Sequence, residues 1–213
     1  TELIDSLENK LFESIKLQSI SDVPIGSFLS GGIDSSLITA LLQKQSTKPI
    51  SSFTVSFPDS STSYNEAPFA KRIAKYLGTN HTEVALTSSE AMNLIPKLPQ
   101  IYSEPFADSS MVPTHLICRE AKRSGLSVVL SGDGADELFG GYNRHIFAPS
   151  INRYIGKFPS KIKELIAFYI SRFPVTQNGL IQDKKQKLVS AISLSNNLSE
   201  SYNLLISYWI ESS

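Results

Sequence analysis

Cysteine is almost missing from this sequence, which has a single one, Cys118, among 213 residues. One thiol excludes a disulfide within the chain and any pair of cooperating thiols, and it fits the reducing environment of the cytoplasm. We expect Cys118 to be a buried structural thiol in the middle of a helix. The three histidines are scattered without the spacing of a zinc site, so we interpret them as structural.

A surplus of charge of one sign is also missing, because 20 basic and 20 acidic residues cancel. No region shows a dominant basic face, so neither nucleic-acid binding nor RNA modification is indicated, and a small-molecule substrate is favoured. The sequence shows no secretory segment and no long apolar span, so no membrane association is predicted. An apolar content of 41% is enough for a sizeable core, and 213 residues suit one α/β domain with some additional residues.

Segments with the pattern of strands alternate with segments with the pattern of helices through the first 130 residues. Apolar residues at helical spacing predict helices at residues 1–18, 33–42, 65–77, 89–98 and 111–122. Short apolar or alternating runs predict strands at residues 25–29, 50–57, 81–86 and 127–130. This alternation predicts an α/β fold with a parallel sheet that has helices on both faces.

The character of the chain changes after residue 145, where only helical patterns follow, with predicted breaks at Pro149, Pro159 and Pro174. We therefore expect a first domain at residues 1–145 and a helical continuation at residues 146–213. The sequence does not begin with methionine and ends inside an apolar helical pattern. It is therefore expected to be a piece of a longer protein, with its helical part truncated.

The first chemical motif is Ser30-Gly31-Gly32, which follows the strand at residues 25–29 and opens the next helix. Such a turn leaves backbone N–H groups uncovered, and the helix directs its positive end to the same place, so an anion can bind there. Asp34 would repel bare phosphate, and its presence makes sense with a divalent cation between the two. The plainer alternative is a β-turn that leads into a capped helix.

This motif is not the lysine-bearing loop of common nucleotide hydrolases, because no Gly-Lys-Ser or Gly-Lys-Thr occurs in the sequence. It resembles instead the Ser-Gly-Gly-x-Asp-Ser loop of the ATP pyrophosphatase family, which residues 30–35 match. The resemblance implies the PP-loop fold, similar to that of the adenine nucleotide alpha hydrolases. It also implies that the loop grips pyrophosphate while AMP is passed to a substrate.

The second motif, at residues 131–142, follows the strand at residues 127–130 and carries Asp133, Asp136 and Glu137. Like charges so close to a phosphate site are costly unless they share a cation. Magnesium binds through one or two carboxylates together with phosphate oxygens, so Asp34 and Asp136 are predicted as metal ligands. Both motifs follow the carboxyl ends of strands, where open α/β sheets bind ligands. The alternative is a glycine-rich turn with solvated acids.

Together the two motifs make the sequence similar to the asparagine synthetase family, specifically to its ATP-dependent synthetase domain, over about residues 3–144. Residues 131–142 closely match the family's second signature, and residues 104–110 resemble a connecting segment of its bacterial members. Carried over position by position, the residues implied to bind ATP are Leu29, Ser30, Gly31, Gly32, Asp34, Ser35, Ser36, Val55, Ser131 and Gly132. Asp34 and Asp136 are implied as magnesium ligands, and Asp34, Asp133 and Asp136 as catalytic residues.

The sequence departs from the family pattern at Asp133, where asparagine synthetases usually have glutamate and the related β-lactam synthetases have tyrosine. This departure leaves the role of Asp133 open. The absence of tyrosine at this position argues against the ring-closing reaction of a β-lactam synthetase. The family also has a downstream lysine, and we expect this sequence to end before it. The family's N-terminal glutaminase domain, which begins with cysteine and supplies ammonia, is expected in the full-length protein.

The resemblance implies an enzyme of the ligase class, with ATP and Mg²⁺, that adenylates the side-chain carboxylate of aspartate and releases pyrophosphate. Ammonia would then displace AMP and form asparagine. Two alternatives stay open. One is a related amidotransferase that acts on a sugar carboxylate in surface-polysaccharide synthesis, because the motifs identify ATP better than the acceptor. The other is a nucleotide-binding module without catalysis.

Overall fold

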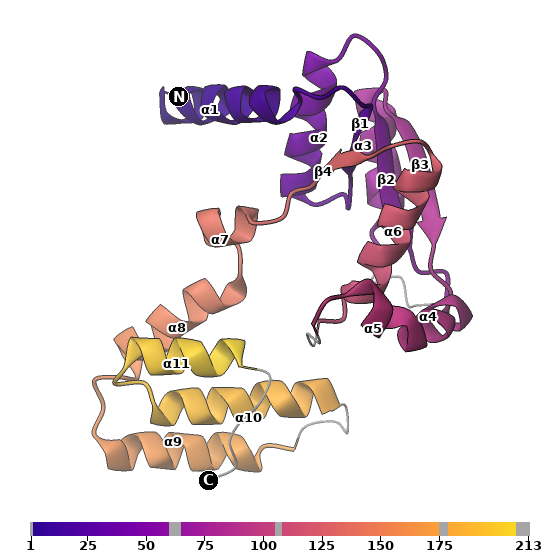
Figure 1. Cartoon of the computed structure of the whole chain (residues 1–213). Coiled ribbons are helices and arrows are strands. Elements are labelled where there is room, and N and C mark those ends of the chain that lie inside the picture. The colour runs from indigo at the N-terminus through magenta and orange to yellow at the C-terminus, as the bar shows by residue number, and fades with distance from the viewer. Residues whose placement is uncertain (1, 60–64, 105–107, 175–178, 208–213) are drawn as a thin grey trace. The chain divides into compact units, whose positions relative to one another are not determined.

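The computed structural model of the chain (Figure 1) describes residues 2–59, 65–104, 108–174 and 179–207. The chain divides into two compact units: unit 1 is Thr1–Asp133 and unit 2 is Gly134–Ser213. The predicted division into domains at residues 145 and 146 stays a prediction. Within the predicted connecting segment, residues 105–107 lie outside the described residues.

Unit 1 is built on a four-stranded parallel sheet with the strand order β3-β2-β1-β4. The strands are β1 (Ile25–Phe28), β2 (Ser51–Ser56), β3 (Asn80–Ala85) and β4 (Val128–Leu130). In the register of the sheet, Ser27 of β1 pairs with Ser52 of β2 and Leu130 of β4. The predicted α/β fold with a parallel sheet is confirmed, and all four predicted strands agree with the structure to within two residues.

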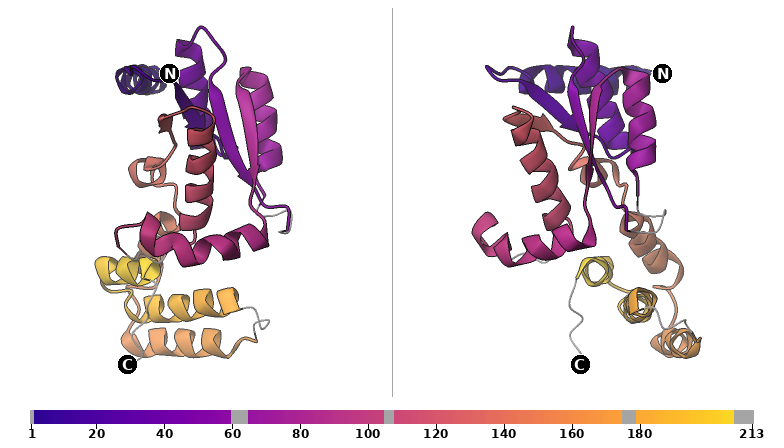
Figure 2. Two further views of the ribbon diagram at one scale, coloured as in Figure 1. Left: turned by 45° about the vertical axis from the view of Figure 1, so that its right-hand side comes forward. Right: turned by 90° about the vertical axis from the view of Figure 1, so that its right-hand side faces the viewer.

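Helices cover both faces of this sheet, and Figure 2 shows α3 and α6 on opposite sides of it. The helices of unit 1 are α1 (Glu2–Gln18), α2 (Ile33–Gln45), α3 (Ala67–Leu77), α4 (Ser88–Leu94), α5 (Leu98–Ile101) and α6 (Met111–Arg123), with the 3₁₀ helix η1 (Ile95–Lys97). Phe53 of β2 packs with Leu116 of α6 in the largest apolar cluster. A second cluster joins Ile15 of α1 with Leu41 of α2. Burial of these apolar side chains holds the layers together.

The polar side chains that alternate along β1 and β2 do not face solvent. Ser27 and Ser52 are fully buried, and the Ser27 hydroxyl lies 3.0 Å from the hydroxyl of Thr39 on α2. Thr39 in turn donates to the backbone carbonyl of Ser35 at 2.7 Å. Because each of these buried hydroxyls has a partner, small polar residues are tolerated under a covering helix. They also allow α2 to approach β1 closely.

Two local predictions for the helices of unit 1 were wrong. The helix expected over residues 89–98 is divided into α4, η1 and α5, because Pro96 and Pro99 lack the N–H that a continuous helix needs. Cys118 is exposed, because α6 turns Leu116, Ile117 and Ala121 toward the sheet and leaves position 118 on its outer side. Partial loss of hydration raises the pKa of the Cys118 thiol above its usual value.

In the described residues of unit 2 the regular elements are helices: α7 (Ala135–Phe139), α8 (Asn143–Tyr154), α9 (Ser160–Arg172), α10 (Gly179–Ser193) and α11 (Leu198–Ile206). The predicted breaks at Pro159 and Pro174 are confirmed, since both flank α9. Pro149 lies inside α8, so the third predicted break was wrong. A proline removes a single helical hydrogen bond, and packing against α11 and α10 supports α8 on both sides of it.

Lysine side chains join the helices of unit 2 to one another. Lys163 is 2% exposed, and its ammonium donates to the carbonyl of Gly156 at 3.0 Å and to the side chain of Asn196. Lys185 on α10 donates to the carbonyl of Phe173 at 2.7 Å, just after the end of α9. These contacts satisfy carbonyl groups at and beyond helix ends. None of the helices in the described residues combines the length and apolar character needed to cross a bilayer.

Candidate nucleotide site at the carboxyl edge of the sheet

The loop at residues 30–32 connects β1 to α2, and its backbone conformation depends on Gly31. Gly31 has φ of 90°, in the region that favours glycine. A Cβ atom at Gly31 would also lie 2.8 Å from the backbone nitrogen of Ala70 and 2.9 Å from Cβ of Phe69. Gly31 is therefore required twice, once for its backbone conformation and once because the first turn of α3 packs directly against it.

Serine hydroxyl groups tie the loop together from inside. The buried Ser35 hydroxyl accepts a hydrogen bond from the Ser30 backbone N–H at 3.1 Å and lies 2.9 Å from the Ser30 hydroxyl. The Ser30 hydroxyl accepts from Gly32 N–H at 3.2 Å, and Ser36 donates to the Gly32 carbonyl at 2.5 Å. Gly32, the N-cap of α2, has no side chain to cap the helix. The positive end of α2 is thus available to an anion at a loop that is already ordered.

The end of β4 meets the start of α2 at Gly132. A Cβ atom at Gly132 would lie 2.7 Å from the backbone nitrogen of Ser35 and 3.1 Å from Cβ of Asp34. The structure therefore brings Asp34 of the first motif beside the first residues of the second motif. Next to Gly132, the Ser131 hydroxyl donates to a carboxylate oxygen of Asp133 at 2.9 Å. This bond orients Asp133 without a charged partner.

The remaining acids of the second motif belong to unit 2 and have their own local contacts. Asp136 accepts at its backbone carbonyl from Gly141 N–H at 3.1 Å, and Glu137 accepts at its carboxylate from the Tyr142 hydroxyl at 2.7 Å. This hydrogen bond lowers the pKa of Glu137 and raises the pKa of Tyr142. Asp34 and Asp136 lie in different units, so their pairing on one metal ion stays a prediction.

The donor set suits magnesium better than a metal that needs a cage of protein ligands. Within the described ranges, no group of three or more histidine, cysteine, aspartate or glutamate side chains could hold a metal ion. Magnesium needs only one or two carboxylates, because water and phosphate oxygens fill its other positions. The half-buried Asp34, next to the helix end that is predicted to bind phosphate, fits that chemistry.

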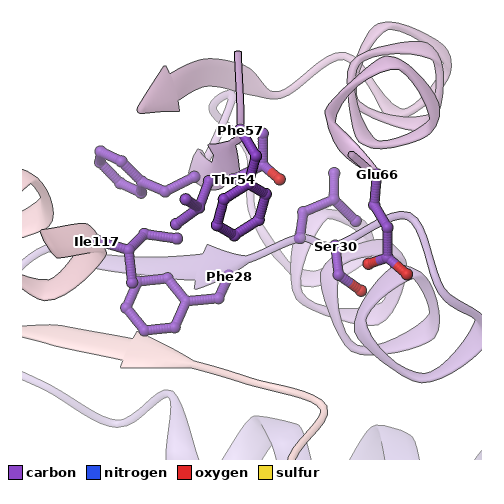
Figure 3. A pocket seen from close by; sticks show the side chains of 9 residues that line it. Phe28, Ser30, Thr54, Phe57, Glu66 and Ile117 are labelled. Atoms are coloured by element: carbon purple, nitrogen blue, oxygen red, sulfur yellow. The ribbon is translucent and has the colours of Figure 1, made fainter. Parts of the chain in front are cut away.

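A cavity of about 210 Å³ opens beside the loop at the ends of β1 and β2 (Figure 3). Three residues predicted to bind the nucleotide, Leu29, Ser30 and Val55, line the same cavity. Its other walls are mainly apolar and aromatic, with Thr54 and Glu66 as polar groups. The complete lining is Phe28, Leu29, Ser30, Phe53, Thr54, Val55, Phe57, Glu66 and Ile117. A mostly apolar pocket next to the predicted anion-binding loop fits a nucleobase and its phosphates.

Sequence reasoning missed the other residues that line this cavity: Phe28, Phe53, Thr54, Phe57, Glu66 and Ile117. Phe28 ends β1 and Phe57 follows β2, so their positions at the carboxyl ends of adjacent parallel strands were an available signal. Ile117 and Glu66 carried no such signal, because α6 and the start of α3 are far from the loop in the sequence.

Comparison with known proteins identifies the family. The family model described as asparagine synthase matches residues 6–210. The chain belongs to the asparagine synthase family. Asparagine synthase similarity therefore extends through α8 to α11, beyond residue 144, where the resemblance of the motifs ended. The helical unit 2 is part of the family pattern and not an unrelated addition.

Curated relatives carry names of this family. The chain is 34% identical over 177 residues to asparagine synthetase [glutamine-hydrolyzing] 1 of Bacillus subtilis, covering 83% of the chain and 27% of that protein. It is 34% identical over 197 residues to a putative asparagine synthetase [glutamine-hydrolyzing] of Methanocaldococcus jannaschii, covering 91% and 36%. Asparagine synthetase B of Escherichia coli is 34% identical over 155 residues, covering 65% and 27%. The chain thus spans between a quarter and two fifths of the length of these relatives.

Proposed function

We propose that this chain is the ATP-dependent, amide-forming part of an asparagine synthetase. In the proposed reaction, the side-chain carboxylate of aspartate attacks the α-phosphorus of ATP. Pyrophosphate leaves, aspartyl-AMP forms, and ammonia then displaces AMP to give asparagine. The observation that carries the proposal is the junction at Ser30, which lines the nucleobase-sized cavity and also belongs to the hydrogen-bonded loop at the start of α2.

This junction gives the nucleotide a direction. The base would lie among Phe28, Val55 and Ile117, and the phosphates would extend past Ser30 to the N-terminus of α2. The backbone N–H groups of the first turn of α2, which no side chain caps, would hold the β- and γ-phosphates as a leaving group. Because Gly132 touches the first turn of α2, the end of β4 limits the site on the side away from β2.

Catalysis would come from positioning and electrostatic stabilisation, with no protein nucleophile. Asp34 and Asp136 would hold the magnesium ion, which supplies positive charge to the pyrophosphate as it leaves. The N–H groups of the first turn of α2 and the dipole of that helix would act on the same charge, and both are in place before the reaction. Asp133, next to the nucleotide-facing Gly132, would take a place at the edge of the site.

The nitrogen source follows from the family. The relatives from Bacillus subtilis and Escherichia coli are named as glutamine-hydrolysing, and the chain spans 27% of each. We infer that an N-terminal glutaminase domain supplies ammonia to this site in the whole protein, whose small-molecule substrates are ATP, aspartate and ammonia. A location in the cytoplasm, where these metabolites occur, belongs to the same proposal.

An oxygen-transfer experiment tests the chemistry. Aspartate labelled with ¹⁸O in the side-chain carboxylate should pass one labelled oxygen to AMP, because the attacking oxygen stays on the α-phosphorus when ammonia displaces the nucleotide. Label in inorganic phosphate, or formation of ADP, would instead indicate γ-phosphoryl transfer and would overturn the proposal. Replacing aspartate with a sugar carboxylate in the same assay distinguishes the amidotransferase alternative.

A further inference from the structure

A cluster of four side chains in unit 2 connects helix α11 to residues 136–142 of the second motif. These residues form the end of α7 and the turn that follows it, and are called here the acid-bearing loop. Its most distant member in sequence is Tyr202 on α11. The Tyr202 hydroxyl lies 3.1 Å from Nε2 of His145 and accepts a hydrogen bond from Nε of Arg144 at 3.4 Å. The rings of His145 and Tyr202 are also stacked, with centroids 5.9 Å apart and planes inclined by 17°. One hydroxyl thus orients two consecutive residues at the start of α8.

Both of those residues hold the ring of Tyr142. The guanidinium carbon of Arg144 lies 3.6 Å from the centroid of the Tyr142 ring, a cation–π contact. The ring of His145 meets the Tyr142 ring edge-on, with centroids 5.6 Å apart. The free end of Tyr142 donates its hydroxyl hydrogen to Glu137 at 2.7 Å. Tyr142 is therefore held on one side by α8 and on the other by the acid-bearing loop.

The loop between Glu137 and Tyr142 has little freedom to absorb a movement of Tyr142. Gly140 has φ of 70°, and a Cβ atom at Gly141 would collide with the carboxylate of Asp136. The Gly141 N–H also donates to the Asp136 carbonyl at 3.1 Å. The Asp136 carboxylate thus lies directly on the backbone of the residue that precedes Tyr142. A shift of Tyr142 would be transmitted to Asp136 through Gly141.

We propose that Tyr202 is a positioning residue for Asp136 and Glu137, acting through Arg144, His145 and Tyr142. In its functional consequence this inference rests on the proposed function, because Asp136 matters as a predicted magnesium ligand. The proposed role of Tyr202 needs no contact with the nucleotide. Its hydroxyl holds Arg144 and His145 in the orientation that keeps Tyr142, and with it the loop, in one place.

The substitution Tyr202→Phe separates positioning from packing. Phenylalanine keeps the ring that stacks on His145 and loses the hydroxyl that both neighbours contact. Tyr154→Phe is the matched control, because Tyr154 lies in the same unit and its side chain is 68% exposed. Arg144→Gln is the second variant, which removes the cation above Tyr142 and leaves Tyr202 intact.

Two measurements are needed on the chain itself. In hydrogen–deuterium exchange, the amides of residues 136–142 should exchange roughly three to ten times faster in Tyr202→Phe and in Arg144→Gln, corresponding to one lost hydrogen bond. Peptides from α9 should not change. In titrations of ATP at several magnesium concentrations, both variants should need about three to ten times more magnesium for half-maximal binding. The Tyr154→Phe control should match the original chain in both measurements.

The results also separate this inference from the proposed function. If the original chain bound no ATP with magnesium, the proposed function would fail, and the exchange measurement would still decide whether Tyr202 orders the loop. Unchanged exchange at residues 136–142 in Tyr202→Phe would overturn the positioning role. Faster exchange with an unchanged magnesium requirement would overturn its link to Asp136.

Discussion

The two motifs of the candidate site are held by different means. The loop at residues 30–36 lies wholly in unit 1, where Gly31 packs against α3, Gly132 packs against α2 and serine hydroxyls bond to one another. The motif at residues 131–142 is divided between the two units. Asp133 is bonded to Ser131 in unit 1, whereas Glu137 in unit 2 is bonded to Tyr142, whose ring contacts Arg144 of α8. The first motif is thus built into the sheet of unit 1, whereas Asp136 and Glu137 of the second motif are held by contacts within unit 2.

The largest expected effect comes from a matched pair of glycines, one in each motif. Gly31 and Gly134 both have positive φ, of 90° and 88°, but only Gly31 has backbone atoms where a Cβ would lie. Gly31→Ala should lower the free energy of unfolding of unit 1 by about 3 kcal/mol, through strain and collision together. Gly134→Ala should cost unit 2 only about 1 kcal/mol, through backbone strain. Urea denaturation measures both, and equal costs would contradict the close contact at Gly31.

The second prediction compares the acids of the two motifs. Asp34→Asn and Asp136→Asn should each weaken magnesium-dependent binding of ATP by about tenfold or more, since each removes a charged ligand. Glu137→Gln should weaken it less, because Glu137 is bonded to Tyr142. Isothermal titration with and without magnesium provides the measurement. Unaltered affinity in both aspartate variants would remove the metal pair that is proposed to join the motifs.

The third prediction concerns the base cavity, which belongs entirely to unit 1. Phe57→Ala should weaken ATP binding about fivefold by removing an aromatic wall, and pyrophosphate binding should stay the same. Tyr76→Ala serves as the control, because Tyr76 lies on α3 with 89% of its side chain exposed. A competition assay with a fluorescent ATP analogue can follow both ligands. Equal losses for ATP and pyrophosphate would show that Phe57 supports the loop and not the base.

The smallest expected effect is a pH dependence of unit 1. Nδ1 of His81 lies 2.9 Å from the hydroxyl of Ser52, and its Nε2 is buried without a hydrogen-bond partner among the described residues. Burial is the largest cause that lowers the pKa of His81; Glu83 raises that pKa by a smaller amount, and Lys71 lowers it further. The folded state therefore disfavours the protonated ring. The contribution of neutral His81 to the stability of unit 1 is fully present above a pH of about 6.5 and is lost as the pH falls below that value.

His81→Asn tests this assignment. The variant should show a flatter dependence of the free energy of unfolding on pH between about 7 and 5 than the original chain, because the titrating group is gone. The stability of unit 2, followed by hydrogen exchange in α9, should be the same in both proteins. A slope that persists in His81→Asn would assign the pH dependence to other groups.

Most of the fold could be predicted because its signals are local. Apolar spacing, the glycines at positions 78 and 125 and the alternating runs placed every strand of the sheet to within two residues. The errors were equally informative. Pro96 and Pro99 divided a predicted helix, Pro149 did not end one, and Cys118 lies on the exposed side of α6. In the last two cases the outcome depended on what packs against the helix, which a local pattern does not contain.

The amino-acid sequence was sufficient to predict three features: the strand, loop and helix at residues 25–42, the acidic second motif, and the alternation of strands and helices that gives a parallel sheet. Each of these depends on residues close together in the chain. Tertiary structure decided the rest. Gly132 lies against Ser35, Ile117 and Val55 line one cavity, and Tyr202 is bonded to Arg144, although each pair is 50 or more residues apart in the sequence. Such contacts depend on how helices pack on the sheet and on one another, and packing is determined by the shape of the whole unit.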